Sequence, residues 1–273
     1  MFGIVVAFKD INFTKGIFAS DWIGFKNFEF LFQSNDAFII TRNTILYNVA
    51  FIVINTAVPI MIAIMLSIIG KKFFQRLFQS LILLPYLISM VIVSYLVYAF
   101  FNADYGMLNK SILPALGIDP VIWYSESKYW PFILILVNTW KSAGYQCIIF
   151  LSTIIGIDKS YYEAATIDGA TVWQQITKIT LPLLKPTIIV LVFLGIGKIF
   201  YSDFGLFYQV PMNSGILYPT TDVIDTYVYR TMMVLGDFGM SSAAGLFQSV
   251  IGFVLVLVSN ILVRRISPED ALF

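Results

Sequence analysis

The chain has 273 residues, of which 59% are hydrophobic, 16% aromatic and only 12% charged. A soluble domain carries about 25% charged residues, so the composition excludes a soluble globular protein and indicates a membrane protein. With no histidine and one cysteine, Cys147, the chain lacks the residues for His-dependent catalysis, an internal disulfide or a Cys-based metal cluster. The near balance of 17 basic and 16 acidic residues argues against a nucleic-acid partner.

Hydrophobic stretches dominate the chain from its first residue. Residues 1–8 are apolar but too few to cross a bilayer. They are either the end of a first helix whose earlier residues are absent from the sequence or an apolar stub. Five later stretches have the roughly 20 mostly apolar residues that a spanning helix needs. These stretches are residues 44–69, 78–101, 131–155, 187–208 and 243–263.

The loops between these spans differ in their basic residues. Lysines and arginines cluster after the first, third and fifth spans, which lie on one side if the spans alternate. The residues are Lys71, Lys72, Arg76, Lys159, Lys178, Lys185, Arg264 and Arg265. Positive loops face the cytoplasm, so we expect a multi-pass membrane protein with a cytoplasmic C-terminus.

The third span carries a polar stripe. Asn138, Ser142 and Tyr145 lie at positions i, i+4 and i+7, which share one face of a helix. Such side chains can hydrogen-bond sugar hydroxyls, and a phenol ring can stack on a sugar. The alternative is that they join helices within the bilayer, as Asn and Ser often do. The spacing alone favours the second interpretation.

The cytoplasmic loop after the third span contains signals for two short helices. Ser160 and Glu163 predict a capping box, and Gly169 predicts the end of that helix. A second box at Thr171 and Gln174 predicts another helix, which runs to Leu181-Pro182. The loop therefore predicts a helix, a sharp turn and a second helix outside the membrane.

This loop also exposes small residues between two acidic ones. Ala164, Ala165, Gly169 and Ala170 would let another protein approach the backbone, and Glu163 and Asp168 could pair with basic groups of that partner. An equally open alternative is a connector that lies flat on the bilayer through Trp173 and Ile176.

At these residues the sequence resembles a known family. Glu163-Ala164-Ala165, Asp168-Gly169-Ala170, Ile179-Thr180-Leu181-Pro182 and Pro186 are similar, at the same spacing, to the EAA loop of the membrane subunits of ABC importers. Leu84-Pro85-Tyr86, Asn138-Thr139-Trp140-Lys141 and Asp237-Phe238-Gly239 resemble the sugar-transporting, maltose-permease-like branch. The first ten residues resemble the end of the first helix in the subgroup that imports oligosaccharides released from polysaccharides.

The resemblance implies an all-α, polytopic fold, the transmembrane domain of a type I ABC importer, in the bacterial cytoplasmic membrane. Five full spans and the end of a truncated first helix would form one permease domain over residues 1–273, with residues 160–182 as its cytoplasmic coupling loop. Six residues would couple the permease to the ATP-binding subunit: Glu163, Ala164, Ala165, Asp168, Gly169 and Ala170. Seven would form the substrate site: Tyr86, Asn138, Lys141, Ser142, Tyr145, Tyr201 and Asp203.

Three ionisable residues depart from the pattern of the family: Lys141, Lys198 and Asp203. Lys198 and Asp203 lie five residues apart in the fourth span, so they project about 140° apart on a helix and cannot simply pair within it. One hypothesis is that Lys141 or Lys198 meets an acidic sugar such as a uronate. The other is that a lysine bridges to Asp203 or extends to the membrane interface.

We therefore predict a permease subunit of an ATP-driven importer for oligosaccharides, acidic or derived from polysaccharides. Its expected partners are a second, different permease, two copies of an ATP-binding subunit, an extracellular sugar-binding protein and membrane lipid. No Walker A sequence is present, so the chain is not expected to be an enzyme or to hold a cofactor, and ATP and Mg²⁺ would bind the partner. The alternative is a secondary transporter or channel that acts without an ATPase; an intramembrane enzyme would need catalytic groups that the spans do not offer.

Overall fold

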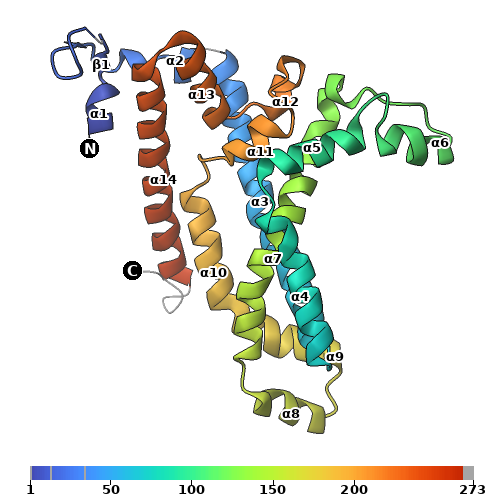
Figure 1. Ribbon diagram of the computed structural model, residues 1–273. Coiled ribbons are helices and arrows are strands. Elements are labelled where there is room, and N and C mark those ends of the chain that lie inside the picture. Colours follow the sequence, from blue (N-terminus) through green and yellow to red (C-terminus); the bar gives the residue numbers. More distant parts are fainter. Residues whose placement is uncertain (1, 13, 34, 267–273) are drawn as a thin grey trace. The chain divides into compact units, whose positions relative to one another are not determined.

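The computed structural model describes residues 2–12, 14–33 and 35–266, and nearly all regular structure in them is helical (Figure 1). Before the first long helix come α1 (Phe2–Val6), the two-residue strands β1 (Lys9–Asp10) and β2 (Asp21–Trp22), which pair antiparallel, and α2 (Phe30–Gln33). The long helices are α3 (Asn35–Ile68), α4 (Lys72–Leu87), α5 (Met90–Phe101), α7 (Trp130–Ile155), α10 (Leu181–Gly197) and α14 (Phe238–Ile266).

Shorter helices connect the long ones. They are α6 (Leu113–Ala115), α8 (Lys159–Ile167), α9 (Val172–Gln175), α11 (Phe204–Gln209), α12 (Tyr218–Thr221) and α13 (Ile224–Leu235). Short 3-10 turns lie at Lys26–Phe28, Trp123–Ser125, Ser127–Tyr129 and Gly215–Leu217, and π turns at Leu108–Ile112 and Ile176–Thr180.

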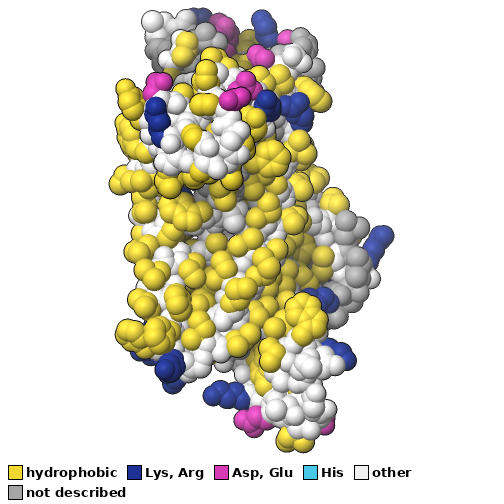
Figure 2. Space-filling model, turned by 90° about the vertical axis from the view of Figure 1, so that its right-hand side faces the viewer, with side chains coloured by type: hydrophobic (Ala, Val, Ile, Leu, Met, Phe, Trp, Pro, Cys, Tyr) yellow, Lys and Arg dark blue, Asp and Glu magenta, His cyan; other side chains and the backbone are white. Residues whose placement is uncertain are grey.

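Among the described residues, four continuous helical segments are long and apolar enough to cross a membrane. They are Asn35–Ile68, Ser127–Ile155, Val172–Gly197 and Phe238–Arg265, and α4 with α5 makes a fifth if the pair counts as one span. The predicted all-α polytopic fold is confirmed. Many apolar side chains on these helices are exposed, such as Val53, Met65 and Phe132, and Figure 2 shows hydrophobic side chains over much of one face. In a bilayer such a surface contacts lipid.

Two predicted spans differ from the structure. The second, residues 78–101, is broken between α4 and α5, whose axes differ by 96°. Ile88 and Ser89 have extended backbones there, and the Ser89 hydroxyl caps α5 by accepting from the Ile92 N–H at 3.4 Å. The mean hydropathy of the long apolar run predicted one span, although Ser89 within it is a capping residue.

The fourth span, predicted at residues 187–208, is shifted toward the N-terminus. The helix continues from Val172 to Gly197 and stops there, and α11 begins only at Phe204, where the Asp203 carboxylate accepts from the Leu206 N–H at 3.1 Å. Since Lys198 and Asp203 do not share a helix, the predicted 140° separation between them is wrong.

The chain folds into two compact units. Unit 1 comprises Met1–Val49, Ser89–Ile135 and Gly197–Leu257, and unit 2 comprises Ala50–Ile88, Leu136–Ile196 and Val258–Phe273. Unit 1 has a core cluster of Ile40, Phe200, Ile224 and Ala244. Unit 2 has a larger cluster of Ile60, Ala63, Leu66, Cys147, Phe150, Leu151, Ile154 and Leu184. Unit 2 carries the loop between α7 and α10 and most of the predicted substrate residues.

Candidate functional site

The first helix of the predicted coupling loop, α8, is capped differently from the prediction. Asp158 is its N-cap, and its carboxylate accepts from the Ser160 N–H at 2.9 Å. This hydrogen bond holds the pKa of the Asp158 carboxyl below its usual range. The helix begins at Lys159, so Ser160 already lies inside it and the predicted Ser160–Glu163 box is wrong. Aspartate and serine are both good N-caps, but Asp158 precedes the first helical residue and Ser160 does not.

The end of α8 follows the prediction. Gly169 has a φ of +76°, the left-handed conformation that glycine adopts at little cost. The Gly169 N–H donates to the Thr166 carbonyl at 3.1 Å and the Ala170 N–H to the Ala165 carbonyl at 2.8 Å. This pair of hydrogen bonds is the Schellman motif, and it turns the chain sharply between α8 and α9 (Figure 1).

The second helix begins with the predicted capping box. The Gln174 N–H donates to the Thr171 hydroxyl at 3.3 Å, and the Thr171 N–H donates to the Gln174 side-chain oxygen at 2.7 Å. The helix does not stop at Leu181-Pro182 as predicted but continues into α10. Pro182 cannot donate a backbone hydrogen bond, and the preceding π turn, in which the Leu181 N–H reaches the Ile176 carbonyl, accommodates that loss.

The outer surface of the loop combines carboxylates, small residues and one very exposed apolar side chain. Glu163, Ala164, Asp168 and Gly169 are exposed, and Ala165 and Ala170 are half-buried. Ile167 is 87% exposed, which is costly for an aliphatic side chain in water. A partner protein that covers Ile167 would remove this cost.

Unit 2 brings two predicted substrate tyrosines together. The rings of Tyr86 on α4 and Tyr145 on α7 are stacked, with centroids 4.8 Å apart and planes at 13°. Their approach depends on Gly144, because a Cβ at this position would overlap the backbone of Ile82 on α4. Both tyrosines remain nearly half exposed, at 44% and 48%. The pair therefore presents an aromatic surface on which a sugar ring could stack.

Lys141 lies beside this pair but already has partners. Its ammonium donates to the carbonyls of Pro85 at 3.3 Å, Tyr86 at 3.1 Å and Ile88, and lies 5.9 Å from the centroid of the Tyr86 ring. These carbonyls lie at the C-terminal end of α4, where the last carbonyls of an α-helix have no hydrogen-bond partner within the helix. The lysine thus stabilises the break between α4 and α5, a contact that its position in the sequence did not reveal.

Besides the Tyr145 ring contact, the polar stripe of α7 makes one contact that joins two helices and one that lies within α7. The Asn138 side-chain oxygen accepts from the Asn55 amide of α3 at 2.7 Å, and the Ser142 hydroxyl donates to the Asn138 carbonyl at 2.8 Å. The side-chain oxygen of Asn55 is buried and has no hydrogen-bond partner among the described residues. Asn55 was not predicted, although an amide inside an apolar run is itself a signal.

The remaining two predicted substrate residues belong to unit 1. The Tyr201 hydroxyl is hydrogen-bonded to the Ser249 hydroxyl at 2.6 Å, and Asp203 caps α11. The half-buried Asp225 carboxylate accepts from the Ser202 N–H at 2.8 Å and from the Gln248 amide at 3.3 Å. Asp225 and Gln248 thus hold the segment between α10 and α11, a role that the sequence did not indicate.

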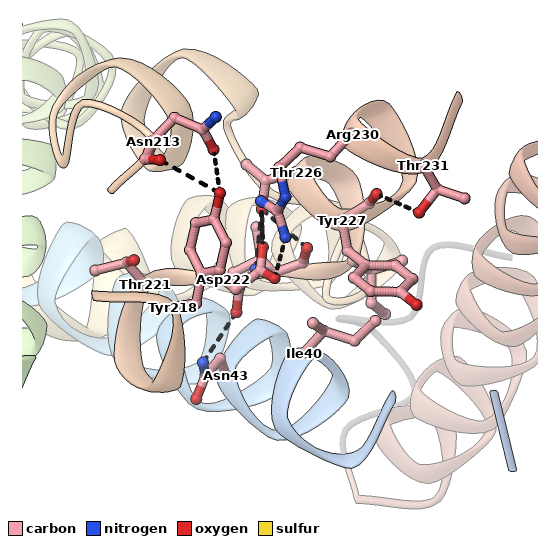
Figure 3. A network of polar contacts seen from close by, with 12 residues as sticks. Ile40, Asn43, Asn213, Tyr218, Thr221, Asp222, Thr226, Tyr227, Arg230 and Thr231 are labelled. Atoms are coloured by element: carbon pink, nitrogen blue, oxygen red, sulfur yellow. Dashed lines mark hydrogen bonds and ion pairs between the residues drawn. The ribbon is translucent and has the colours of Figure 1, made fainter. Parts of the chain in front are cut away.

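A second network of unit 1, which the sequence also did not indicate, centres on Asp222 (Figure 3). Its carboxylate pairs with Arg230 and accepts from the Thr226 hydroxyl at 2.6 Å. The Asn43 amide of α3 donates to the Asp222 carbonyl at 2.9 Å, and the Arg230 guanidinium lies 4.0 Å from the centroid of the Tyr218 ring. The network joins α12 and α13 to α3, so its role is structural.

Comparisons with known proteins identify the family. Residues 55–268 match the model of the binding-protein-dependent transport system inner membrane component. Over 269 residues the chain is 32% identical to protein LplB of Bacillus subtilis (strain 168), which covers 98% of this chain and 84% of that protein. It is 33% identical over 269 residues, 98% of this chain and 83% of the relative, to the polygalacturonan/rhamnogalacturonan transport system permease protein YteP of the same strain.

A solved structure has the same fold. In the crystal structure of a bacterial ABC transporter involved in the import of the acidic polysaccharide alginate, one chain matches with a TM-score of 0.87 and 35% identity. The match covers 97% of this chain and 88% of that one. The predicted resemblance is confirmed, and the chain belongs to the family of inner-membrane components of binding-protein-dependent transport systems.

Proposed function

We propose that the chain is the permease subunit of an ATP-driven importer that takes up oligosaccharides delivered by an external binding protein. Relatives named for polygalacturonan/rhamnogalacturonan and for galactooligosaccharide transport support a carbohydrate substrate. A related alginate ABC transporter has been solved in complex with a periplasmic protein bound to an alginate pentasaccharide, at 36% identity to this chain. It supports delivery by a binding protein.

The stacked pair of Tyr86 and Tyr145 carries the proposal for the substrate. Two exposed, nearly parallel phenol rings can stack on the C–H face of a sugar. Tyr86, Asn138 and Tyr145 would contact the sugar. Ser142, whose hydroxyl is already bonded, and Lys141 would hold the site in shape. Tyr201 and Asp203, which belong to unit 1, stay separate predicted contacts of the sugar.

Uptake measurements test this site. Tyr86→Ala or Tyr145→Ala should lower binding-protein-dependent oligosaccharide uptake at least tenfold, about 1.4 kcal/mol, whereas Tyr86→Phe, which keeps the ring, should retain most of it. Tyr95→Ala, which removes an exposed tyrosine of α5, is the matched control. Equal uptake by the Ala and Phe variants would contradict the proposed stacking.

The loop between α7 and α10 would couple the permease to a separate ATP-binding subunit on the cytoplasmic side, with the C-terminus on the same side. Glu163 and Asp168 would pair with basic residues of that subunit, and Ile167, Ala164 and Gly169 would enter its surface. ATP and Mg²⁺ would be bound there, and a second, different permease would complete the pathway.

Charge reversal tests the coupling. Changing Glu163 and Asp168 to Lys should abolish co-purification with the ATPase and stop uptake while the chain still inserts in the membrane. Changing the exposed Asp104 and Asp119 to Lys makes the same charge change elsewhere and should leave co-purification intact. Full uptake by the chain without an ATPase would instead favour a secondary transporter or channel.

A further inference from the structure

Unit 2 contains a cavity of about 670 Å³ at the loop ends of its helices. It is bordered by the end of α3, the first two turns of α4, the end of α7, and the helices α8 and α9 with the π turn that follows (Figure 1). The cavity thus lies where the membrane helices meet the coupling loop.

The lining of the cavity includes both apolar and basic residues. Ile64, Ile68 and Ile154 come from the ends of the apolar helices, whereas Lys72, Arg76 and Lys159 come from α4 and α8. Among the described residues, no Asp or Glu lines the cavity. In the part of the chain that the structure describes, none of the three basic side chains has an ion-pair partner. Three like charges around one space repel one another, so the cavity favours an anion.

The beginning of α4 has two distinct faces that place it at a membrane surface. Lys72, Gln75, Arg76 and Gln79, at spacings of three and four residues, all line the cavity. Phe73, Phe74, Leu77, Phe78 and Leu81 lie between or after them and are exposed. An amphipathic helix with basic residues on one face and aromatic and aliphatic residues on the other is typical of the membrane interface.

We propose that this cavity binds the headgroup of an anionic phospholipid from the cytoplasmic leaflet. The phosphate would lie among Lys72, Arg76 and Lys159, the amides of Gln75 and Gln79 would donate to its oxygens, and the acyl chains would lie along the isoleucines. Basic pockets between membrane helices on the cytoplasmic side have the chemistry to bind such headgroups. The site is independent of the transported sugar and places a lipid directly beneath the coupling loop.

Native mass spectrometry of the purified transporter, with all subunits present, tests the proposal by counting bound lipids. The delipidated complex is titrated with dihexanoyl phosphatidylglycerol, with dihexanoyl phosphatidylcholine and with glycerol 1-phosphate. We expect one tightly retained phosphatidylglycerol for this permease, at least tenfold weaker phosphatidylcholine, and no retention of glycerol 1-phosphate, which lacks acyl chains.

A charge-matched pair of variants locates the site. Lys72→Gln, Arg76→Gln and Lys159→Gln together should weaken phosphatidylglycerol binding on the order of a hundredfold, since each basic group near an anionic lipid is worth about fivefold. Lys71→Gln, Lys178→Gln and Arg264→Gln together remove the same charge from exposed positions outside the cavity and should keep the affinity. All six side chains are exposed, so both variants should fold, which their unliganded melting temperatures check.

Three results would overturn the proposal. Equal retention of the neutral lipid would show a non-specific annular contact. Equal affinities of the two triple variants would place the anion elsewhere. Binding of glycerol 1-phosphate as tight as that of the lipid would assign the cavity to a soluble phosphate ester rather than to the membrane.

Discussion

Lys141→Met separates two roles for this residue: a counter-ion for an acidic sugar, and a support for the break in the second span. The variant keeps the length and apolar stem of the side chain but removes the ammonium from the carbonyls of Pro85, Tyr86 and Ile88. A hydrogen bond to a charged group contributes about 1.5–3 kcal/mol. One of the three is long, at 3.3 Å, and the lysine is only half-buried, so we expect a total loss of about 2–3 kcal/mol.

Two assays read out this loss. The melting temperature of the purified transporter should fall by roughly 4–10 °C. Uptake of a neutral and of a uronate-containing oligosaccharide should fall by similar factors, because both would stack on the tyrosine pair of the proposed site. Lys198→Met, which removes an exposed lysine with no ion-pair partner among the described residues, is the control and should leave the melting temperature unchanged. Unchanged stability of Lys141→Met together with a selective loss of uronate uptake would refute the supporting role.

Three further variants test contacts within the units. Gly144→Ala should cost at least about 3 kcal/mol of stability, because its Cβ meets backbone that cannot move aside; Gly245→Ala has open space and should be nearly neutral, so equal melting temperatures would contradict the packing. Arg230→Met should cost about 3–5 kcal/mol by leaving the Asp222 carboxylate, which is 7% exposed, without its cation, and adding Asp222→Leu should recover part of the loss. Burial raises the pKa of the Asp225 carboxyl, so the folded state binds its proton more readily and wild-type stability should fall as pH rises from about 4 through the raised pKa. The Asp225→Asn variant should lack this fall. Equal changes in the melting temperatures of the wild type and the variant between about pH 4 and 7 would contradict this explanation.

The parts of the structure that the sequence predicted well depend on local or averaged signals. A spanning helix is recognised from the mean hydropathy of about 20 residues, so α7 and α14 were found with only small errors at their ends. The turn at Gly169 and the box at Thr171 depend on residues within four positions of each other.

The errors occurred where two local signals competed or where a distant residue decided the outcome. Asp158 and Ser160 are both capable N-caps, and the sequence contains no measure of which one precedes the helix. The break after Leu87 lies inside an apolar run, and its carbonyls are satisfied by a lysine 53 to 56 positions away in the chain. Such contacts exist only once the helices pack, so composition and spacing could not reveal them.

The continuous helix from Val172 to Gly197 determines how far a movement at the coupling loop can reach. Its 26 residues extend about 39 Å at 1.5 Å per residue. If it turned as a rigid rod about its loop end by about 10°, Gly197 would be displaced by roughly 7 Å, more than one helical turn of 5.4 Å. The π turn at Ile176–Thr180 interrupts the regular hydrogen-bond pattern near the loop end of this helix, so its stiffness would set how much of a rotation at the proposed ATPase contact reaches Gly197.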